Sequence, residues 1–124
     1  MTNHATSAGL SSGDRDELRA ILNDEAVRAG EQATALAASF EAIVEAAELV
    51  NTDDERDPEG TTIAFERAQV TALHRQAEAD LEAIQAAMDR LAAGEYGFCA
   101  TCGEPIGLDR LRALPASTQC IRCA

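Results

Sequence analysis

Apolar residues recur along the first half of the chain at alternating steps of four and three. The repeat passes from Leu22 to Val50 through nine positions, and none of these positions is polar. A mean spacing of 3.5 residues is the period of a coiled coil, in which a helix buries an apolar seam against another helix. The pattern therefore predicts a long first helix that buries this seam.

A second seam with the same spacing runs from Ile63 to Leu91. Two of its nine positions, Arg67 and His74, are polar, and Leu73 could replace His74 if the helix rotated slightly. Two long helices joined by a short turn run antiparallel, because they can then bury their seams against each other. The predicted fold is mainly α, a long antiparallel helical hairpin of the coiled-coil type.

The hairpin is expected to begin at Asp14. Residues 1–13 are small and polar without periodicity, and we expect them to form a disordered tail. Asp14 can cap the backbone N–H groups of a first helical turn, and Glu17 adds negative charge near the positive end of the helix. The chain is therefore divided into this tail, a hairpin over residues 14–93 and a C-terminal module over residues 94–124.

An acidic turn over residues 51–60 is expected to join the helices, with Pro58 near the start of the second helix. Its acids are Asp53, Asp54, Glu55, Asp57 and Glu59. As a calcium loop read from Asp53, the turn lacks the required Gly and the final Glu, because Pro58 and Ala64 occupy those positions. Two interpretations stay open, a solvated turn and an acidic probe for a metal ion or a basic channel on a partner.

Four cysteines form two pairs near the C-terminus, Cys99 with Cys102 and Cys120 with Cys123. Each pair has a two-residue spacer, and 17 residues separate the pairs. This spacing is typical of a tetrahedral Zn(II) site, because each tight turn presents two thiolates to one ion. Four thiolates leave no position for water, so we predict one structural zinc ion. Gly103 suits the left-handed conformation that such a turn often needs.

The C-terminal module is too small to fold on its few apolar residues, and zinc would supply the missing stability. Leu108, Leu111 and Leu114 predict a short helix that ends at Pro115. A lone Cys-x-x-Cys can also be a redox pair, which leaves a thiol redox sensor as an alternative. Two matched pairs favour zinc.

The chain carries 10 basic and 22 acidic residues, a formal net charge of -12. Such a charge repels phosphate, so direct binding of DNA or RNA is not expected. The sequence has no membrane-spanning stretch and no signal peptide, and we expect a cytoplasmic protein without membrane contact. His74 is interpreted as a packing residue. We find no nucleophile triad, phosphate loop or paired catalytic acids, so the chain is predicted not to be an enzyme.

Further residues accompany the cysteines of the C-terminal module. They are Gly94, Glu95, Tyr96, Gly97, Phe98, Gly103, Ile106, Gly107, Arg110, Leu111, Ala113 and Pro115. Together with the cysteines, this set resembles the finger signature of the DksA/TraR family. The preceding hairpin with its acidic turn extends the resemblance to roughly residues 14–124.

The resemblance implies a transcription regulator that binds bacterial RNA polymerase directly, without binding DNA. Members of the family insert the hairpin into the secondary channel of the polymerase and bring tip aspartates near the catalytic Mg(II). In this chain the tip aspartates would be Asp54 and Asp57, beside Asp53. Glu59 stands where the best-known tip has Ala, so a negative charge replaces a small apolar contact.

Members that respond to ppGpp use basic residues late in the second helix, before the finger proline and after the last cysteine. The first two positions are Ala83 and Leu114 here, and the sequence ends at Ala124. A ppGpp site is therefore expected to be absent or poor. The main alternative to a polymerase regulator is a coiled-coil adaptor that docks another protein through the same hairpin.

Overall fold

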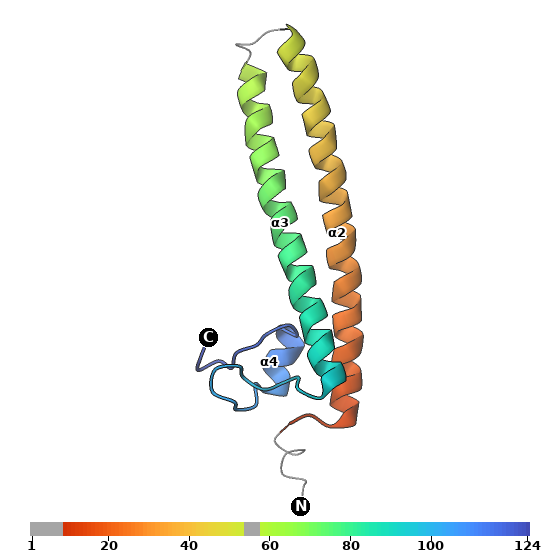
Figure 1. The fold of residues 1–124 in the computed structure, drawn as a ribbon, viewed down its shortest axis with the longest axis vertical. Helices are drawn as coiled ribbons and strands as arrows, with labels where there is room; N and C mark the ends of the chain where they lie inside the picture. Colours follow the sequence, from red (N-terminus) through yellow and green to blue (C-terminus); the bar gives the residue numbers. More distant parts are fainter. Residues whose placement is uncertain (1–8, 54–57) are drawn as a thin grey trace, which may run out of the picture. The chain divides into compact units, whose positions relative to one another are not determined.

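The computed structural model describes residues 9–53 and 58–124, with side chains over 9–49 and 61–124. These residues form three helices, α2 (Ser12–Asp53), α3 (Pro58–Ala93) and α4 (Leu108–Ala113) (Figure 1). The described part of the chain has no strand, and its β pairing is one isolated bridge between Phe98 and Pro105. No helix in these ranges is both long and apolar enough to cross a membrane.

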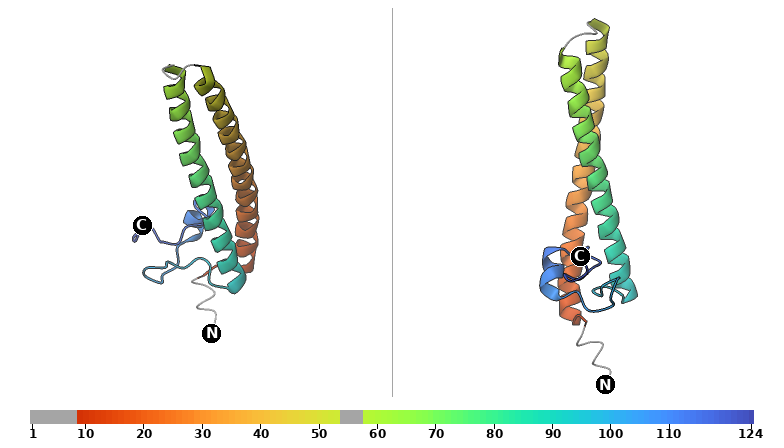
Figure 2. Two further views of the ribbon diagram at one scale, coloured as in Figure 1. Left: turned by 45° about the horizontal axis from the view of Figure 1, so that its top comes forward. Right: turned by 90° about the vertical axis from the view of Figure 1, so that its left-hand side faces the viewer.

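The chain divides into two compact units, and both long helices pass through each of them. One unit is Met1–Val27 with Glu82–Ala124, and the other is Arg28–Leu81. In each unit a segment of α2 lies beside an antiparallel segment of α3, which Figure 2 shows from two further directions. The predicted mainly α fold with a helical hairpin is confirmed.

Most described positions of the two predicted seams are among the less exposed residues of the unit Arg28–Leu81. Buried or half-buried seam residues are Ala29, Ala33, Leu36, Phe40, Ile43 and Ala47 on α2 and Ile63, Val70, His74, Ala77 and Leu81 on α3. Arg67 is exposed, so the prediction that places it in the seam is wrong. Leu73 does not replace His74, because Leu73 is 45% exposed whereas the His74 side chain is 29% exposed.

The unit made of Met1–Val27 and Glu82–Ala124 has a larger core. The long helices and the C-terminal module over residues 94–124, called the finger from here on, both contribute buried apolar residues to it. Its buried residues include Leu10, Leu18, Leu22, Ile84, Ala87, Leu91, Tyr96, Ile106 and Leu111. Leu18, Leu22 and Leu111 are fully buried. Because these residues come from the starts and ends of distant segments, the finger is packed against the helix ends that precede it.

The first helix begins at Ser12, two residues before the predicted cap. Ser11 is the capping residue: its Oγ accepts a hydrogen bond from the Asp14 N–H at 3.0 Å. The Asp14 carboxylate accepts one in return from the Ser11 N–H at 3.2 Å. This reciprocal arrangement is a capping box, in which the acid is the fourth residue rather than the cap. Residues 1–8 of the expected tail lie outside the described residues.

The second helix has the predicted limits. It begins at Pro58 and ends at Ala93, and Gly94 follows with a φ of 79°. The N–H groups of Gly94 and Glu95 donate to the carbonyls of Leu91 and Arg90, at 3.3 and 2.8 Å. This pair of bonds is a Schellman motif, which satisfies carbonyls that a helix end leaves free.

The connection between the long helices is shorter than the predicted turn. α2 continues to Asp53, so only residues 54–57 separate it from α3, and these lie outside the described residues. The acids, Pro and Gly of residues 51–60, without a large apolar side chain among them, led to the prediction of an earlier end. Propensity is a weak determinant compared with the hydrogen bond that each added residue gains in an existing helix.

Candidate metal centre

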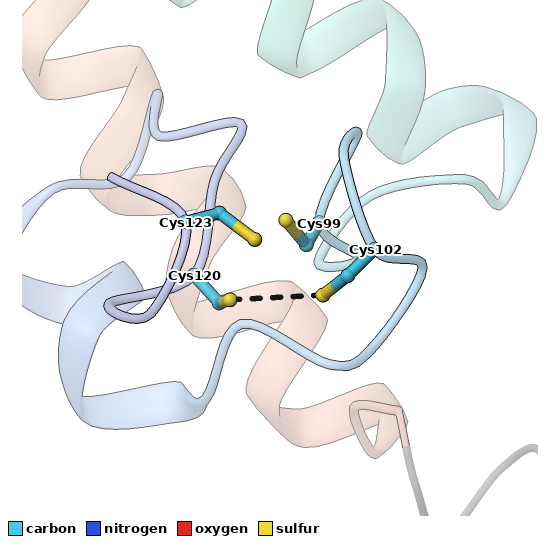
Figure 3. Close-up of side chains that lie close together, drawn as sticks. All are labelled: Cys99, Cys102, Cys120 and Cys123. Atoms are coloured by element: carbon cyan, nitrogen blue, oxygen red, sulfur yellow. Dashed lines mark hydrogen bonds between the residues drawn. The ribbon is translucent and has the colours of Figure 1, made fainter.

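Four thiol groups converge at the finger, as the sequence predicts. The Sγ atoms of Cys99, Cys102, Cys120 and Cys123 all lie within 4.8 Å of one another. Figure 3 shows the four side chains pointing toward a common centre, with the dashed line joining Cys102 and Cys120. All four are free thiols in the structure. Cys99 and Cys120 are buried whereas Cys102 is exposed, so the centre is open to solvent on one side.

The spacing of the sulfur atoms fits a zinc ion. In a tetrahedral site with Zn–S bonds of about 2.3 Å, two sulfurs lie roughly 3.8 Å apart. The Sγ atoms of Cys102 and Cys120 are 3.7 Å apart. Four soft ligands at this spacing suit Zn(II), and they leave no ligand position for a reactive water molecule. The four cysteines are therefore positioned to bind one structural metal ion.

Tight turns bring each pair of thiols together. The Gly103 N–H donates to the Cys99 carbonyl at 2.8 Å, and Gly103 has a φ of 79°, in the left-handed region predicted for it. In the second pair, the Cys123 N–H donates to the Cys120 carbonyl at 3.1 Å. A side chain at Gly103 would strain the first turn, because L-residues rarely adopt this conformation.

The two turns are also held to each other and to α4. The Ala100 N–H donates to the Thr118 carbonyl at 2.8 Å, and Gln119 Nε2 donates to Thr101 Oγ1 at 3.0 Å. From α4, Arg110 Nε donates to the Gln119 carbonyl at 2.9 Å. The short helix predicted from the leucine spacing therefore has a second role, which is to fix the loop before Cys120.

Backbone dipoles around the cluster favour thiolates. The Cys102 N–H, followed by that of Cys120, lowers the pKa of the Cys99 thiol to about 6. Burial raises the pKa of Cys120, but the N–H groups of Cys123 and Arg122 outweigh it and lower the pKa overall. Hydrogen bonds to the Cys120 and Cys99 sulfurs raise the pKa of Cys123 to about 12. The protein thus stabilises some thiolates by itself, and a bound cation would stabilise the rest.

The structure does not describe the side chains of the predicted tip residues. Asp54 and Asp57 lie outside the described residues, and Asp53 is the last residue of α2, without a described side chain. The role of these aspartates stays a prediction from the sequence.

Sequence reasoning missed the contacts that tie the finger to the start of α2. Leu10 is 7% exposed, and Arg112 of α4 pairs with Glu17. A bond within the finger was missed as well: the Tyr96 hydroxyl donates to the buried Pro115 carbonyl at 2.7 Å. The Ser11 and Asp14 spacing was the available signal for the helix start. The other contacts join positions too far apart in sequence for any local pattern to reveal them.

The structure combines a helical hairpin with a four-cysteine zinc finger. Comparisons with known proteins show which other proteins share these two features. Residues 94–124 match the family model of the prokaryotic dksA/traR C4-type zinc finger. The solved structure of transcription factor DksA2 from Pseudomonas aeruginosa is similar with a TM-score of 0.59 and 28% identity, covering 90% of this chain and 80% of that one.

Two curated proteins are similar over shorter segments. The RNA polymerase-binding transcription factor DksA of Haemophilus influenzae is 34% identical over 68 residues, which are 54% of this chain and 47% of that protein. An uncharacterized protein of Aquifex aeolicus is 41% identical over 46 residues, 37% of this chain and 32% of that protein. The chain thus spans less than half the length of either curated relative.

These findings agree: residues 94–124 carry a zinc finger of the DksA/TraR type, and the chain as a whole is similar in structure to the transcription factor DksA2. The family consists of transcription factors rather than enzymes, which agrees with the prediction from the sequence.

Proposed function

We propose that this protein regulates transcription by binding RNA polymerase directly and inserting its hairpin into the secondary channel. The observation that carries the proposal is the structural similarity to DksA2, which extends over 90% of the chain and therefore includes the hairpin as well as the finger. The name of the Haemophilus influenzae relative, an RNA polymerase-binding transcription factor, supports the same partner.

The acting residues in this proposal are Asp54 and Asp57, beside Asp53 at the end of α2. They supply carboxylates to the connection between the two long helices, where a channel-inserted hairpin would meet a catalytic metal ion. Glu59 adds another negative charge. The insertion requires no contact with DNA.

The charge of the protein supports a partner other than nucleic acid. The chain has a formal net charge of -12, and a zinc ion held by four thiolates carries a net charge of about -2. Phosphate backbones would be repelled, whereas a basic channel would attract such a surface. A regulator of this kind works beside polymerase, in the cytoplasm.

We further propose that ppGpp does not enhance the effect of this protein. Two positions at which responsive relatives carry basic residues are Ala83 and Leu114 here. Both side chains are exposed, Leu114 to 51%, and neither can pair with a phosphate. Transcription assays with and without ppGpp test this point, and strong enhancement with the native polymerase would contradict it.

The tip is tested with the double variant Asp54→Asn plus Asp57→Asn. Its matched control is Asp24→Asn plus Asp89→Asn, which removes the same charge from exposed positions of the helices. We expect pull-downs with core RNA polymerase from the native host to recover the wild type and both double variants. In transcription assays the tip variant should lose its effect and the control should keep it.

Two outcomes would overturn the proposal. Wild-type protein that never co-purifies with polymerase would favour the coiled-coil adaptor, with another protein as its partner. A tip variant that regulates transcription as the wild type does would retain the polymerase as partner but remove the role of the aspartates.

A further inference from the structure

The segment that precedes α2 is packed on the zinc finger. Leu10 is 7% exposed, although its neighbours Ser11 and Ser12 are exposed. A Cβ atom added to Gly97 would lie 3.2 Å from Leu10 Cδ1 and 3.7 Å from Leu111 Cδ1. The Leu10 side chain therefore occupies a space that exists because residue 97 has no side chain, and Leu111 of α4 lies beside this space.

The same segment is fixed to the first turn of α2. The Leu10 carbonyl accepts a hydrogen bond from Arg15 Nη1 at 3.0 Å. The next residue, Ser11, closes the capping box with Asp14, and its carbonyl accepts the Arg15 N–H at 2.9 Å. A displacement of Leu10 would therefore disturb the bonds that begin the helix.

On the finger side, Gly97 belongs to a loop that the metal centre closes. The Gly97 carbonyl accepts the Ile106 N–H at 2.8 Å, and the Cys99 N–H donates to the Glu104 carbonyl at 2.8 Å. Cys99 and Cys102 lie within this loop and supply two of the four ligands. Without the ion, the loop keeps its hydrogen bonds but loses the link between its two cysteines and the second pair, in a module with few apolar residues.

We propose that Leu10 is a latch through which zinc occupancy controls the stability of the first turns of α2. With zinc bound, the loop around Gly97 is fixed and Leu10 stays buried. When zinc is lost, the loop no longer holds the space for Leu10, and the capped end of the helix opens. The finger then acts as a zinc-responsive device at the start of the hairpin.

A contiguous series of contacts supports this coupling. It leads from the ligand Cys99 through Gly97 to Leu10 and from there to the capping box at Ser11. Helix ends open more easily than helix centres, so a buried anchor at such an end has a large effect on local opening. Leu10 is the described apolar side chain that precedes the helix start, which makes it the anchor.

The test is hydrogen exchange on the full chain, with and without a zinc chelator, for the amides of residues 16–22. The variant is Leu10→Ala, and its matched control is Leu114→Ala, the same change at a finger residue that is 51% exposed. Amides of residues 63–81 report global unfolding. Zinc content is measured for each protein, and Leu10→Val serves as a milder variant if Leu10→Ala retains no metal.

In the wild type and in Leu114→Ala, chelation of zinc should speed the exchange of the amide hydrogens of residues 16–22 about tenfold or more. The reason is that Leu10 loses its burial when the loop around Gly97 is no longer fixed. In Leu10→Ala the exchange should already be fast with zinc bound, and chelation should change it less than about twofold. Two outcomes would overturn the latch: wild-type exchange that chelation leaves unchanged, or a chelation effect in Leu10→Ala and Leu10→Val as large as in the wild type.

Discussion

Glu17 and Arg112 form a two-point ion pair although 95 positions separate them in the sequence. Arg112 Nε donates to Glu17 Oε2 at 2.8 Å, and its Nη2 donates to Oε1 at 3.1 Å. The planar guanidinium matches both carboxylate oxygens, which a lysine cannot do. This hydrogen bonding holds the pKa of Glu17 below its usual value of 4.5. The pair joins the start of α2 to α4.

Glu17→Gln should lower the stability of the finger and its adjoining helix ends, and the loss should depend on pH. Because the pKa of Glu17 is lowered in the folded state, its contribution is present above pH 4.5 and disappears as the pH falls through the folded value. Urea unfolding of both proteins at several pH values measures the difference. Glu31→Gln, at an exposed position of α2, is the control, and a difference that stays constant with pH would contradict the prediction.

Gly97→Ala should destabilise the protein more than Gly94→Ala. Both glycines have positive φ, 97° and 79°, so each substitution strains the backbone by about 1 kcal/mol. Only at Gly97 would the new Cβ also press on Leu10, at 3.2 Å, whereas nothing lies within 4 Å at Gly94. Overpacking should add roughly 1 kcal/mol or more to the unfolding free energy lost.

A double variant separates the two causes at Gly97. Combined with Leu10→Ala, which removes the crowded side chain, Gly97→Ala should cost less than it does alone. Urea unfolding of the four proteins gives the coupling. Strict additivity would mean that the contact between these residues has no energetic role.

The Tyr96 hydroxyl should contribute to stability up to alkaline pH. Its hydrogen bond to the Pro115 carbonyl is buried, and Tyr96→Phe should cost about 1 to 2 kcal/mol because that carbonyl loses its partner. Burial raises the pKa of Tyr96 to about 12 from its ordinary 10.0. The neutral form is therefore favoured in the fold, and its contribution is lost as the pH rises from 10.0 toward 12. Unfolding midpoints of the phenylalanine variant should lack this alkaline decline.

The elements that repeat a pattern were predictable from the sequence. The spacing of three and four identifies the seams of α2 and α3, and the two Cys-x-x-Cys pairs identify the metal centre, because both patterns follow from local geometry. The end of α3 just before Gly94 is predictable for the same reason. Arg67 shows the limit of this reasoning, since a long polar side chain at a seam position can turn to solvent.

The relationships between distant segments could not be predicted. Leu10 stands among small polar residues, and nothing around it indicates that Gly97 leaves a space for its side chain. Likewise, neither Glu17 nor Arg112 differs in its local sequence from the other charged residues of the chain. Such contacts depend on how the finger packs on the helix ends, which is a property of the complete fold.

Removal of zinc should unfold the module over residues 94–124 and leave most of the helical structure of Arg28–Leu81, whose packing uses no cysteine. Tyr96 is the sole tyrosine of a chain without tryptophan, so its fluorescence reports on the finger. Chelation should change this fluorescence strongly and the far-ultraviolet circular dichroism modestly, and metal analysis should find one zinc ion per chain. Cys120→Ser should behave as the chelated protein does, because a buried thiolate ligand is lost. Substoichiometric metal together with a reversible disulfide would instead assign the four thiols to redox chemistry.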